Sequence, residues 1–164
     1  MPDALHFPAL PPVSPQSEAE WDNYFDLRWR VLRAPWHQAR GSEKDDREAE
    51  SEHLMIVGQD SRPLAVGRLH FNSLAVAQIR FMAVDPAAQG RGLGTAILQK
   101  LEQRARAAGA TSIVLNSRDD ARPFYQKHGF AVVGPAPTMF DAIKHVRMQK
   151  DLSASHPRAA RGEA

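Results

Sequence analysis

Three glycines separated by single residues stand at the start of a predicted helix, in the stretch "QGRGLGT" from Gln89 to Thr95. Glycine is costly in backbone entropy at a helix start, so its use there indicates that another group comes close to the backbone. The first turn of a helix carries unpaired N–H groups and the positive end of the helix dipole, which together attract a phosphate. The spacing therefore predicts a phosphate-binding loop built from backbone N–H groups.

Two common phosphate-binding motifs do not fit this loop. A Walker-type loop ends in Gly-Lys-Ser/Thr, whereas Gly94 is followed by Thr95 and Ala96. A dinucleotide-binding fingerprint needs a third glycine five positions after the first, and counting from Gly90 this position is Thr95. It also needs an acidic residue after the next strand, where this chain has Asn116. Both motifs are excluded.

The loop instead resembles the acyl-coenzyme-A pyrophosphate loop of the GNAT N-acetyltransferase superfamily, in which Gln or Arg precedes x-x-Gly-x-Gly/Ala. Gln89, Gly92 and Gly94 match this pattern, and the preceding "MAVDP" is typical of the family. A second stretch, "ARPFYQKHGF" at 121–130, resembles the family signature Ala-x-x-Phe-Tyr-x-x-x-Gly-Phe. Together with the predicted strand order, the resemblance extends over residues 17–150.

The resemblance implies that backbone N–H groups of the loop bind the pyrophosphate of acetyl-CoA. It also implies a bulge in the preceding strand, whose backbone is left free for the pantetheine arm and polarises the thioester carbonyl. The family's usual asparagine position is Arg118 here, so Asn116 becomes the candidate contact at the end of the next strand. The predicted coenzyme contacts are Met82, Ala83, Val84, Gln89, Gly90, Arg91, Gly92, Leu93, Gly94, Thr95 and Asn116.

Tyr125, in the second motif, is the predicted catalytic residue, because the tyrosine of this family motif acts as the general acid that protonates the leaving thiolate. The alternative is a core aromatic residue whose hydroxyl binds a backbone carbonyl. The attacking amine also needs a base or a water relay, and the candidates are Glu43, His70 and His145. No group of residues has the spacing of metal ligands, so no metal is expected.

Hydrophobic periodicity predicts the elements that position these residues. We expect helices over 18–33, 92–108 and "RPFYQKH", and strands over 53–60, 63–71, 75–85, 111–116, 130–134 and 142–152. The strands at 75–85 and 111–116 should be parallel, because a helix of about four turns connects them. The predicted fold class is α/β: a GNAT fold with a mixed, mostly antiparallel sheet splayed at one parallel strand pair, and helices on both faces.

Local signals predict the limits of the helices and of the domain. Ser17 and Glu20 form a capping box before the first helix, and Asp119 or Asp120 is expected to cap the last one. A single domain is expected over residues 1–152, including a proline-rich segment at 1–16 and followed by a disordered tail at 153–164.

Charged residues surround the first helix. Arg28, Arg30 and Arg33 cannot all be buried without partners, and we expect some of them to pair with acids of the stretch 43–52. The acidic segment 41–52 is interpreted either as a solvated loop or short exposed helix, or as the border of an opening near this helix. An arginine that faces such an opening would favour an acceptor with a carboxylate or phosphate.

Composition limits the class of protein. The chain has 164 residues, a net charge of +2 and no cysteine. These values indicate one domain and argue against a large basic surface for nucleic acid. They also exclude disulfides, cysteine-bound zinc and a thiol nucleophile. Because no apolar stretch is long enough to cross a bilayer and the first residues do not resemble a signal peptide, we expect a cytoplasmic protein without a membrane partner.

The sequence thus predicts an N-acetyltransferase that transfers an acetyl group from acetyl-CoA to a primary amine of a small molecule or peptide. Without cysteine there is no thiol acyl-enzyme, which favours direct attack in a ternary complex. The alternative is a non-catalytic acyl-CoA-binding sensor or regulatory module, and transfer of a longer acyl group stays open. Some members of the family are homodimers, but no sequence feature decides the oligomeric state.

Overall fold

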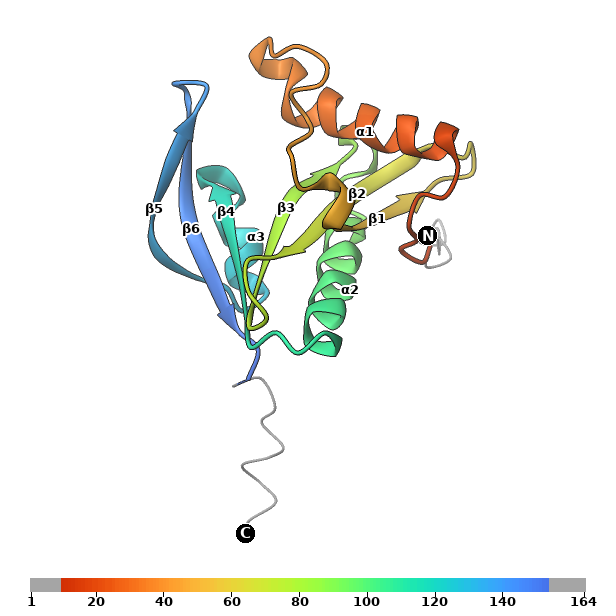
Figure 1. Cartoon of the computed structure of the whole chain (residues 1–164). Helices are drawn as coiled ribbons and strands as arrows, with labels where there is room; N and C mark the ends of the chain where they lie inside the picture. Colours follow the sequence, from red (N-terminus) through yellow and green to blue (C-terminus); the bar gives the residue numbers. More distant parts are fainter. Residues whose placement is uncertain (1–9, 154–164) are drawn as a thin grey trace, which may run out of the picture.

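The computed structural model describes residues 10–153, which form a mixed sheet flanked by helices (Figure 1). The helices are α1 (Glu18–Leu32), α2 (Leu93–Ala107) and α3 (Arg122–Lys127). The strands are β1 (Glu52–Val57), β2 (Pro63–Phe71), β3 (Val76–Val84), β4 (Ser112–Arg118), β5 (Ala131–Met139) and β6 (Ile143–Asp151). Their order in the sheet is β1-β2-β3-β4-β6-β5, with β3 and β4 as the parallel pair. The predicted fold class is confirmed.

The sheet has a hydrophobic core on each face, because successive side chains of a strand point to opposite sides. On β1, Leu54 and Ile56 belong to the core that contains the α2 residues, whereas Met55 belongs to the core that contains the α1 residues. The two long helices therefore cover opposite faces of the sheet. None of the helices within residues 10–153 is long and apolar enough to cross a bilayer.

Helix α1 begins at the predicted capping box. The Ser17 hydroxyl accepts from the Glu20 backbone N–H at 3.1 Å, and the Glu20 carboxylate accepts from the Ser17 backbone N–H at 3.3 Å. The predicted cap of α3 is wrong, because a 3₁₀ turn at 119–121 precedes this helix and Ala121 occupies the cap position. The two aspartates of that turn instead form ion pairs with Arg118 and Arg122.

Strands β3 and β4 pair over a short distance only. Their parallel ladder joins Val76–Gln78 to Ser112–Val114, and beyond these residues the strands separate (Figure 1). A bulge lies in the free part of β3, where Phe81 has a φ of 58° and the register with β2 shifts. A bulge bends its strand away from regular pairing. The sheet is therefore split beside β3, as the family resemblance implied.

Two of the predictions concern the segments at the ends of the chain. The tail predicted to be disordered lies outside the described residues, apart from Ser153. Of the proline-rich N-terminal segment, residues 10–16 are described, and Val13 forms an isolated antiparallel bridge with Met55 on β1. This bridge places the N-terminal segment beside the outer edge of the sheet.

Candidate active site

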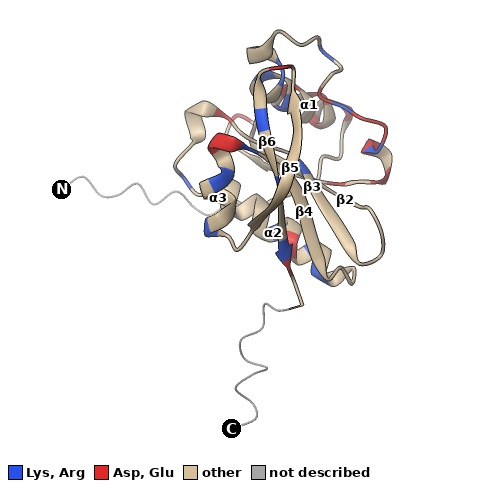
Figure 2. Ribbon diagram, turned by 90° about the vertical axis from the view of Figure 1, so that its left-hand side faces the viewer, with Lys and Arg blue, Asp and Glu red and all other residues tan. Residues whose placement is uncertain are grey.

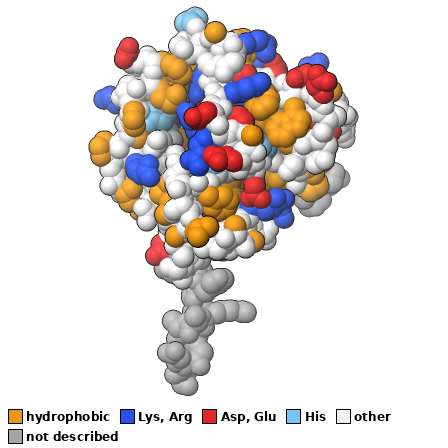
Figure 3. Space-filling model, in the orientation of Figure 1, with side chains coloured by type: hydrophobic (Ala, Val, Ile, Leu, Met, Phe, Trp, Pro, Cys, Tyr) orange, Lys and Arg blue, Asp and Glu red, His pale blue; other side chains and the backbone are white. Residues whose placement is uncertain are grey.

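A cavity of about 480 Å³ occupies the opening between β3 and β4. Its walls come from the end of α1, the loop before β1, strands β2 to β4, the start of α3 and the β5–β6 hairpin. Figure 3 shows basic side chains lying next to acidic ones at the centre of this face of the molecule. The cavity is therefore lined by charged as well as apolar groups.

Three of the predicted site residues meet in this cavity: Met82 from β3, Asn116 from β4 and Tyr125 from α3. Tyr125 is held between Phe124 and Phe130, whose rings lie edge-on to it with centroids 5.0 and 5.8 Å away. Burial raises the pKa of the Tyr125 hydroxyl far above its usual value. The phenol is thus kept protonated, which is the form that a general acid requires.

The glycine loop lies at the start of α2, and neither its residues 89–95 nor Ala83 and Val84 are among those that line the cavity. Gly90 and Gly92 have φ values of 80° and 77°, a conformation that other residues adopt only with strain. Gly92 is the N-cap of α2, and no side chain caps this helix end. The first-turn N–H groups of α2 are consequently not bound by a capping side chain, as expected for a phosphate-binding loop.

Gly94 has a different role from these two glycines. A Cβ atom added to it would lie 3.5 Å from Phe124 and from Val84, which is ordinary van der Waals contact. The fold would therefore accept alanine at this position. An added Cβ would face Phe124 and Val84, which agrees with the Gly/Ala alternative in the family pattern. The side chain of the next residue, Thr95, is bound to His128 at 3.1 Å.

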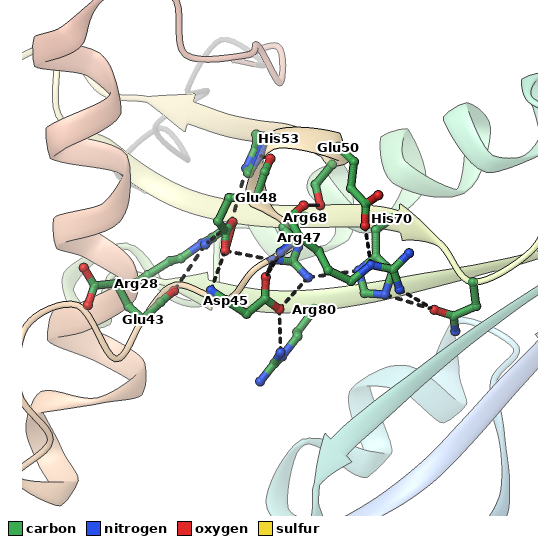
Figure 4. Close-up of polar contacts among 12 residues, drawn as sticks. Arg28, Glu43, Asp45, Arg47, Glu48, Glu50, His53, Arg68, His70 and Arg80 are labelled. Atoms are coloured by element: carbon green, nitrogen blue, oxygen red, sulfur yellow. Dashed lines mark hydrogen bonds and ion pairs between the residues drawn. The ribbon is translucent and has the colours of Figure 1, made fainter.

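The acidic segment before β1 supplies the partners of two fully buried arginines (Figure 4). Arg28 donates to the Glu48 carboxylate at 2.8 Å. Arg68 binds both oxygens of Asp45, at 2.6 and 2.9 Å, and the second oxygen of Glu48 at 2.8 Å. The expected pairing of α1 arginines with this segment is confirmed for Arg28. The charged segment 41–52, which leads into β1 (Figure 2), borders the cavity through Asp45, Asp46 and Arg47, as the second interpretation predicted. It is not simply a solvated loop, because the carboxylates of Asp45 and Glu48 neutralise buried arginines.

The other two arginines of α1 have separate environments. Arg30 lies on the surface and pairs with Asp26 at 2.8 Å. Arg33 is 7% exposed, lines the cavity and donates to the backbone carbonyls of Ser42 and Leu32, both at 2.9 Å. Of the three predicted arginines, Arg33 is therefore the one that faces the opening.

Phe81 and Arg80 are site residues that the sequence analysis missed. The ring of Phe81 lies at the bulge. The guanidinium carbons of four arginines lie 4.3 to 5.5 Å from its centroid: Arg28, Arg33, Arg68 and Arg80. Arg80 pairs with Asp45 at 2.6 Å and lines the cavity. A charged residue in the middle of an apolar strand was the available signal for Arg80. No residue type signalled the position of Phe81.

The three candidates for the general base differ in their hydrogen bonds. The Glu43 carboxylate is buried against the Gly41 N–H at 2.6 Å, and this residue does not line the cavity. His70 lines the cavity, but its Nδ1 contacts Arg68 at 2.9 Å and its Nε2 contacts Asn72 at 3.2 Å. Because a guanidinium only donates, the Nδ1 lone pair of His70 is already used.

His145 is the remaining candidate, and it lines the cavity from β6. Its Nδ1 lies 2.9 Å from the Ile143 carbonyl oxygen. Since a carbonyl only accepts, Nδ1 carries the proton and the lone pair is on Nε2. His145 is therefore the candidate whose hydrogen bond leaves it in the tautomer with a basic Nε2.

Comparisons with known proteins identify the family. The acetyltransferase (GNAT) family model matches residues 21–130. The chain is 29% identical over 139 residues to the uncharacterized N-acetyltransferase YjcF of Bacillus subtilis (strain 168), and the match spans 85% of this chain and 98% of YjcF. It is 34% identical over 128 residues to the glucosamine 6-phosphate N-acetyltransferase of Trypanosoma brucei brucei, spanning 76% of each chain.

A structural neighbour agrees with this result. The crystal structure of an aminoglycoside 6'-N-acetyltransferase complexed with coenzyme A matches with a TM-score of 0.71 and 15% identity, over 86% of this chain and 96% of that chain. At this identity the likeness concerns the fold. The chain belongs to the GNAT acetyltransferase family, and it is an acyltransferase.

Proposed function

We propose that the protein transfers the acetyl group of acetyl-CoA to a primary amine, which attacks the thioester directly while both substrates are bound. The observation that carries this proposal is the meeting of Met82, Asn116 and Tyr125 in one cavity at the split between β3 and β4. The glycine loop follows β3, the strand that carries Met82. In this proposal a coenzyme whose pyrophosphate is bound by the loop extends along β3, so that its thioester end enters the cavity.

Backbone groups hold and activate the donor in this proposal. The N–H groups of residues 89–95 bind the pyrophosphate, with Arg91 close to its charge. The backbone of Met82, Ala83 and Val84 binds the pantetheine arm, and Asn116 contacts it from β4. Residues 81 and 82 lie outside the paired register with β2, so the bulge is the place where a β3 N–H group polarises the thioester carbonyl.

Two side chains transfer the protons. Nε2 of His145 takes a proton from the ammonium form of the acceptor, which frees the amine lone pair for attack on the carbonyl carbon. The C–N bond forms, the C–S bond breaks, and the Tyr125 hydroxyl protonates the leaving sulfur. The second proton lost by the nitrogen of the tetrahedral intermediate restores the Tyr125 hydroxyl. The products are the N-acetylated acceptor and free coenzyme A thiol.

The test measures thiol release by the purified full-length chain from acetyl-CoA in a panel of primary amines, with the product identified by its mass increase. Release above the hydrolysis background supports transfer, and its absence for every amine supports a non-catalytic acyl-CoA-binding protein instead. Intersecting double-reciprocal plots would support the ternary complex, whereas parallel plots would contradict it.

Variants test the two roles. We expect Tyr125→Phe to lower kcat by about 10²-fold or more, the usual contribution of a general acid. His145→Asn should lower the rate at neutral pH and recover at higher pH, because the fraction of unprotonated amine then rises. His37→Asn, which changes an exposed histidine outside the cavity lining, is the matched control. Unchanged turnover in Tyr125→Phe would remove this residue from the mechanism.

A further inference from the structure

Arg33 is a buried cation without a carboxylate partner among the described residues. It is 7% exposed, and its guanidinium donates to the carbonyl oxygens of Ser42 and Leu32. The same side chain lines the cavity. Burial lowers the pKa of Arg33, and the nearby charge of Arg80 lowers it further. The positive charge of Arg33 is therefore incompletely balanced, which is costly inside a protein.

Arg80 shares its counter-charge with another residue. Its Nη1 binds Asp45 at 2.6 Å, but the same carboxylate also binds the fully buried Arg68 through both oxygens. One carboxylate thus serves two guanidinium groups. Arg80 is 41% exposed at its side chain and lines the cavity, so the rest of its guanidinium is accessible to a ligand there.

The charges around Phe81 do not sum to zero. Four guanidinium groups lie against its ring, and two carboxylates, Asp45 and Glu48, are paired with them. A third carboxylate, Glu43, acts on Arg33 through its charge and binds a backbone N–H. Four positive charges thus face three negative ones, which leaves an excess of one positive charge. The other charged residues of the lining, Asp46, Arg47 and Arg118, add one negative and two positive charges, so the excess stays positive. Of the four arginines around Phe81, the cavity-lining Arg33 and Arg80 are the ones that a ligand can reach.

We infer that Arg33 and Arg80 form an anion subsite beside Phe81, and that the acceptor amine carries a phosphate or a carboxylate group that binds there. Guanidinium groups suit this task because their donors match the oxygens of either anion. This inference rests on the proposed function, since it assigns this end of the cavity to the acceptor. The subsite is separate from the predicted pyrophosphate loop, because residues 89–95 are not among those that line the cavity.

The first test measures anion binding without turnover. The full-length protein is saturated with coenzyme A to occupy the donor site, and inorganic phosphate or acetate is then titrated while the melting temperature is recorded. We expect either anion to stabilise the wild type and to have little effect on Arg33→Gln and Arg80→Gln. Arg62→Gln, in an exposed turn outside the cavity lining, is the matched control and should respond like the wild type. Equal responses of all four proteins, or none in the wild type, would overturn the inference.

The second test compares acceptors that differ in one anionic group. The pairs are glucosamine 6-phosphate with glucosamine for the phosphate, and glycine with glycinamide for the carboxylate. We expect kcat/KM to favour the anionic member of one pair by at least about 10-fold, as for a hydrogen bond to a charged group, and the preference to disappear in Arg33→Gln. The pair that shows this preference identifies the anionic group of the acceptor as a phosphate or a carboxylate.

The two proposals fail in different ways. Equal use of both members of each pair by the wild type, or a preference that survives in both arginine variants, contradicts the anion subsite and leaves acetyl transfer intact. Thiol release that stays at background for every amine, with anion binding still dependent on Arg33, contradicts acetyl transfer instead. Arg80→Gln changes a half-exposed side chain and so keeps the test valid if Arg33→Gln does not fold.

Discussion

Asp45 binds both a buried arginine of the core and an arginine that lines the cavity. We expect Asp45→Asn to destabilise the protein strongly. The wild-type carboxylate binds Arg68 through both oxygens, at 2.6 and 2.9 Å, and Arg80 at 2.6 Å. The asparagine variant lacks the negative charge and keeps one acceptor oxygen. Arg68, which is fully buried, then retains only the Glu48 carboxylate as its counter-charge.

The size of the effect follows from this geometry. Removing one partner of a buried ion pair costs about 3–5 kcal/mol in the free energy of unfolding. The Asp45 side chain is 18% exposed and Glu48 remains bound to Arg68, so we expect the lower limit, about 3 kcal/mol. With a urea m-value of about 2 kcal/mol/M, the unfolding midpoint falls by roughly 1.5 M.

The assay is urea unfolding at neutral pH, with Asp46→Asn as the matched control. Asp46 is the next residue in the chain and is exposed, so Asp46→Asn should change the free energy of unfolding by less than about 0.5 kcal/mol. An unchanged m-value in both variants would show that the midpoints report stability. Equal midpoints for the two variants would refute the conclusion that the acidic segment neutralises buried arginines.

The pH dependence gives an independent check. Burial alone would raise the pKa of Asp45, but hydrogen bonds from the Arg68 side chain and the Arg47 backbone N–H, together with the charges of Arg68 and Arg80, hold this pKa well below its usual range. A carboxyl group whose pKa is lower in the folded state stabilises the protein above its unfolded pKa of about 3.9, and this contribution is lost as the pH falls below that value. Asp45→Asn should therefore lose less stability than the wild type on acidification.

Three further predictions concern other parts of the molecule. Gly67→Ala should lose about 1–3 kcal/mol of stability, because its Cβ would lie 2.6 Å from Ile97 and 2.7 Å from Met82; Gly134→Ala, with open space around it, is the control for urea unfolding. Gly92→Ala should bind coenzyme A at least about 10-fold more weakly by calorimetry, because Gly92 has a φ of 77° that alanine adopts only with strain. Gly94→Ala, whose Cβ would face Phe124 and Val84, is the control and should bind like the wild type; equal affinity of the two variants would contradict the phosphate-binding loop. Both tyrosines of the chain are buried, and burial raises the pKa of Tyr24 to about 12. Phenolate absorbance should therefore appear near pH 10 only in unfolded protein. The contribution of the raised tyrosine pKa to stability is fully present below pH 10 and is lost between pH 10 and 12. Phenolate formation near pH 10 in the folded protein would contradict this burial.

Local signals predicted the elements well. The capping box needs only Ser17 and Glu20, three residues apart, and the structure confirms both hydrogen bonds. The parallel pair of strands followed from the length of the connection between them, and it is also confirmed. The predicted cap of α3 is wrong because residues 119–121 form a 3₁₀ turn that runs into the helix, so that Ala121 takes the cap position, and a motif of a few residues does not reveal this turn.

The charged part of the site depends on contacts between distant residues. Asp45 lies 23 residues from Arg68 and 35 from Arg80 in the sequence, so the composition of the acidic segment alone does not reveal its partners. The left-handed backbone of Phe81 is likewise set by the fold, because an aromatic residue does not favour a positive φ. Met82 and Tyr125 could be assigned beforehand because the family resemblance, rather than local physics, identifies them, whereas Asn116 was assigned from its place at the end of a predicted strand.

The short ladder between β3 and β4 has a mechanical consequence. Three residue pairs join the block β1-β2-β3 to the block β4-β6-β5, so the sheet consists of two stiff halves with a narrow hinge at one end. A small rotation about that hinge moves the two walls of the cavity apart or together at the far end, where the coenzyme and acceptor groups would meet. In the proposed reaction, the distance between the reacting atoms would therefore depend on the angle between these two parts of the sheet.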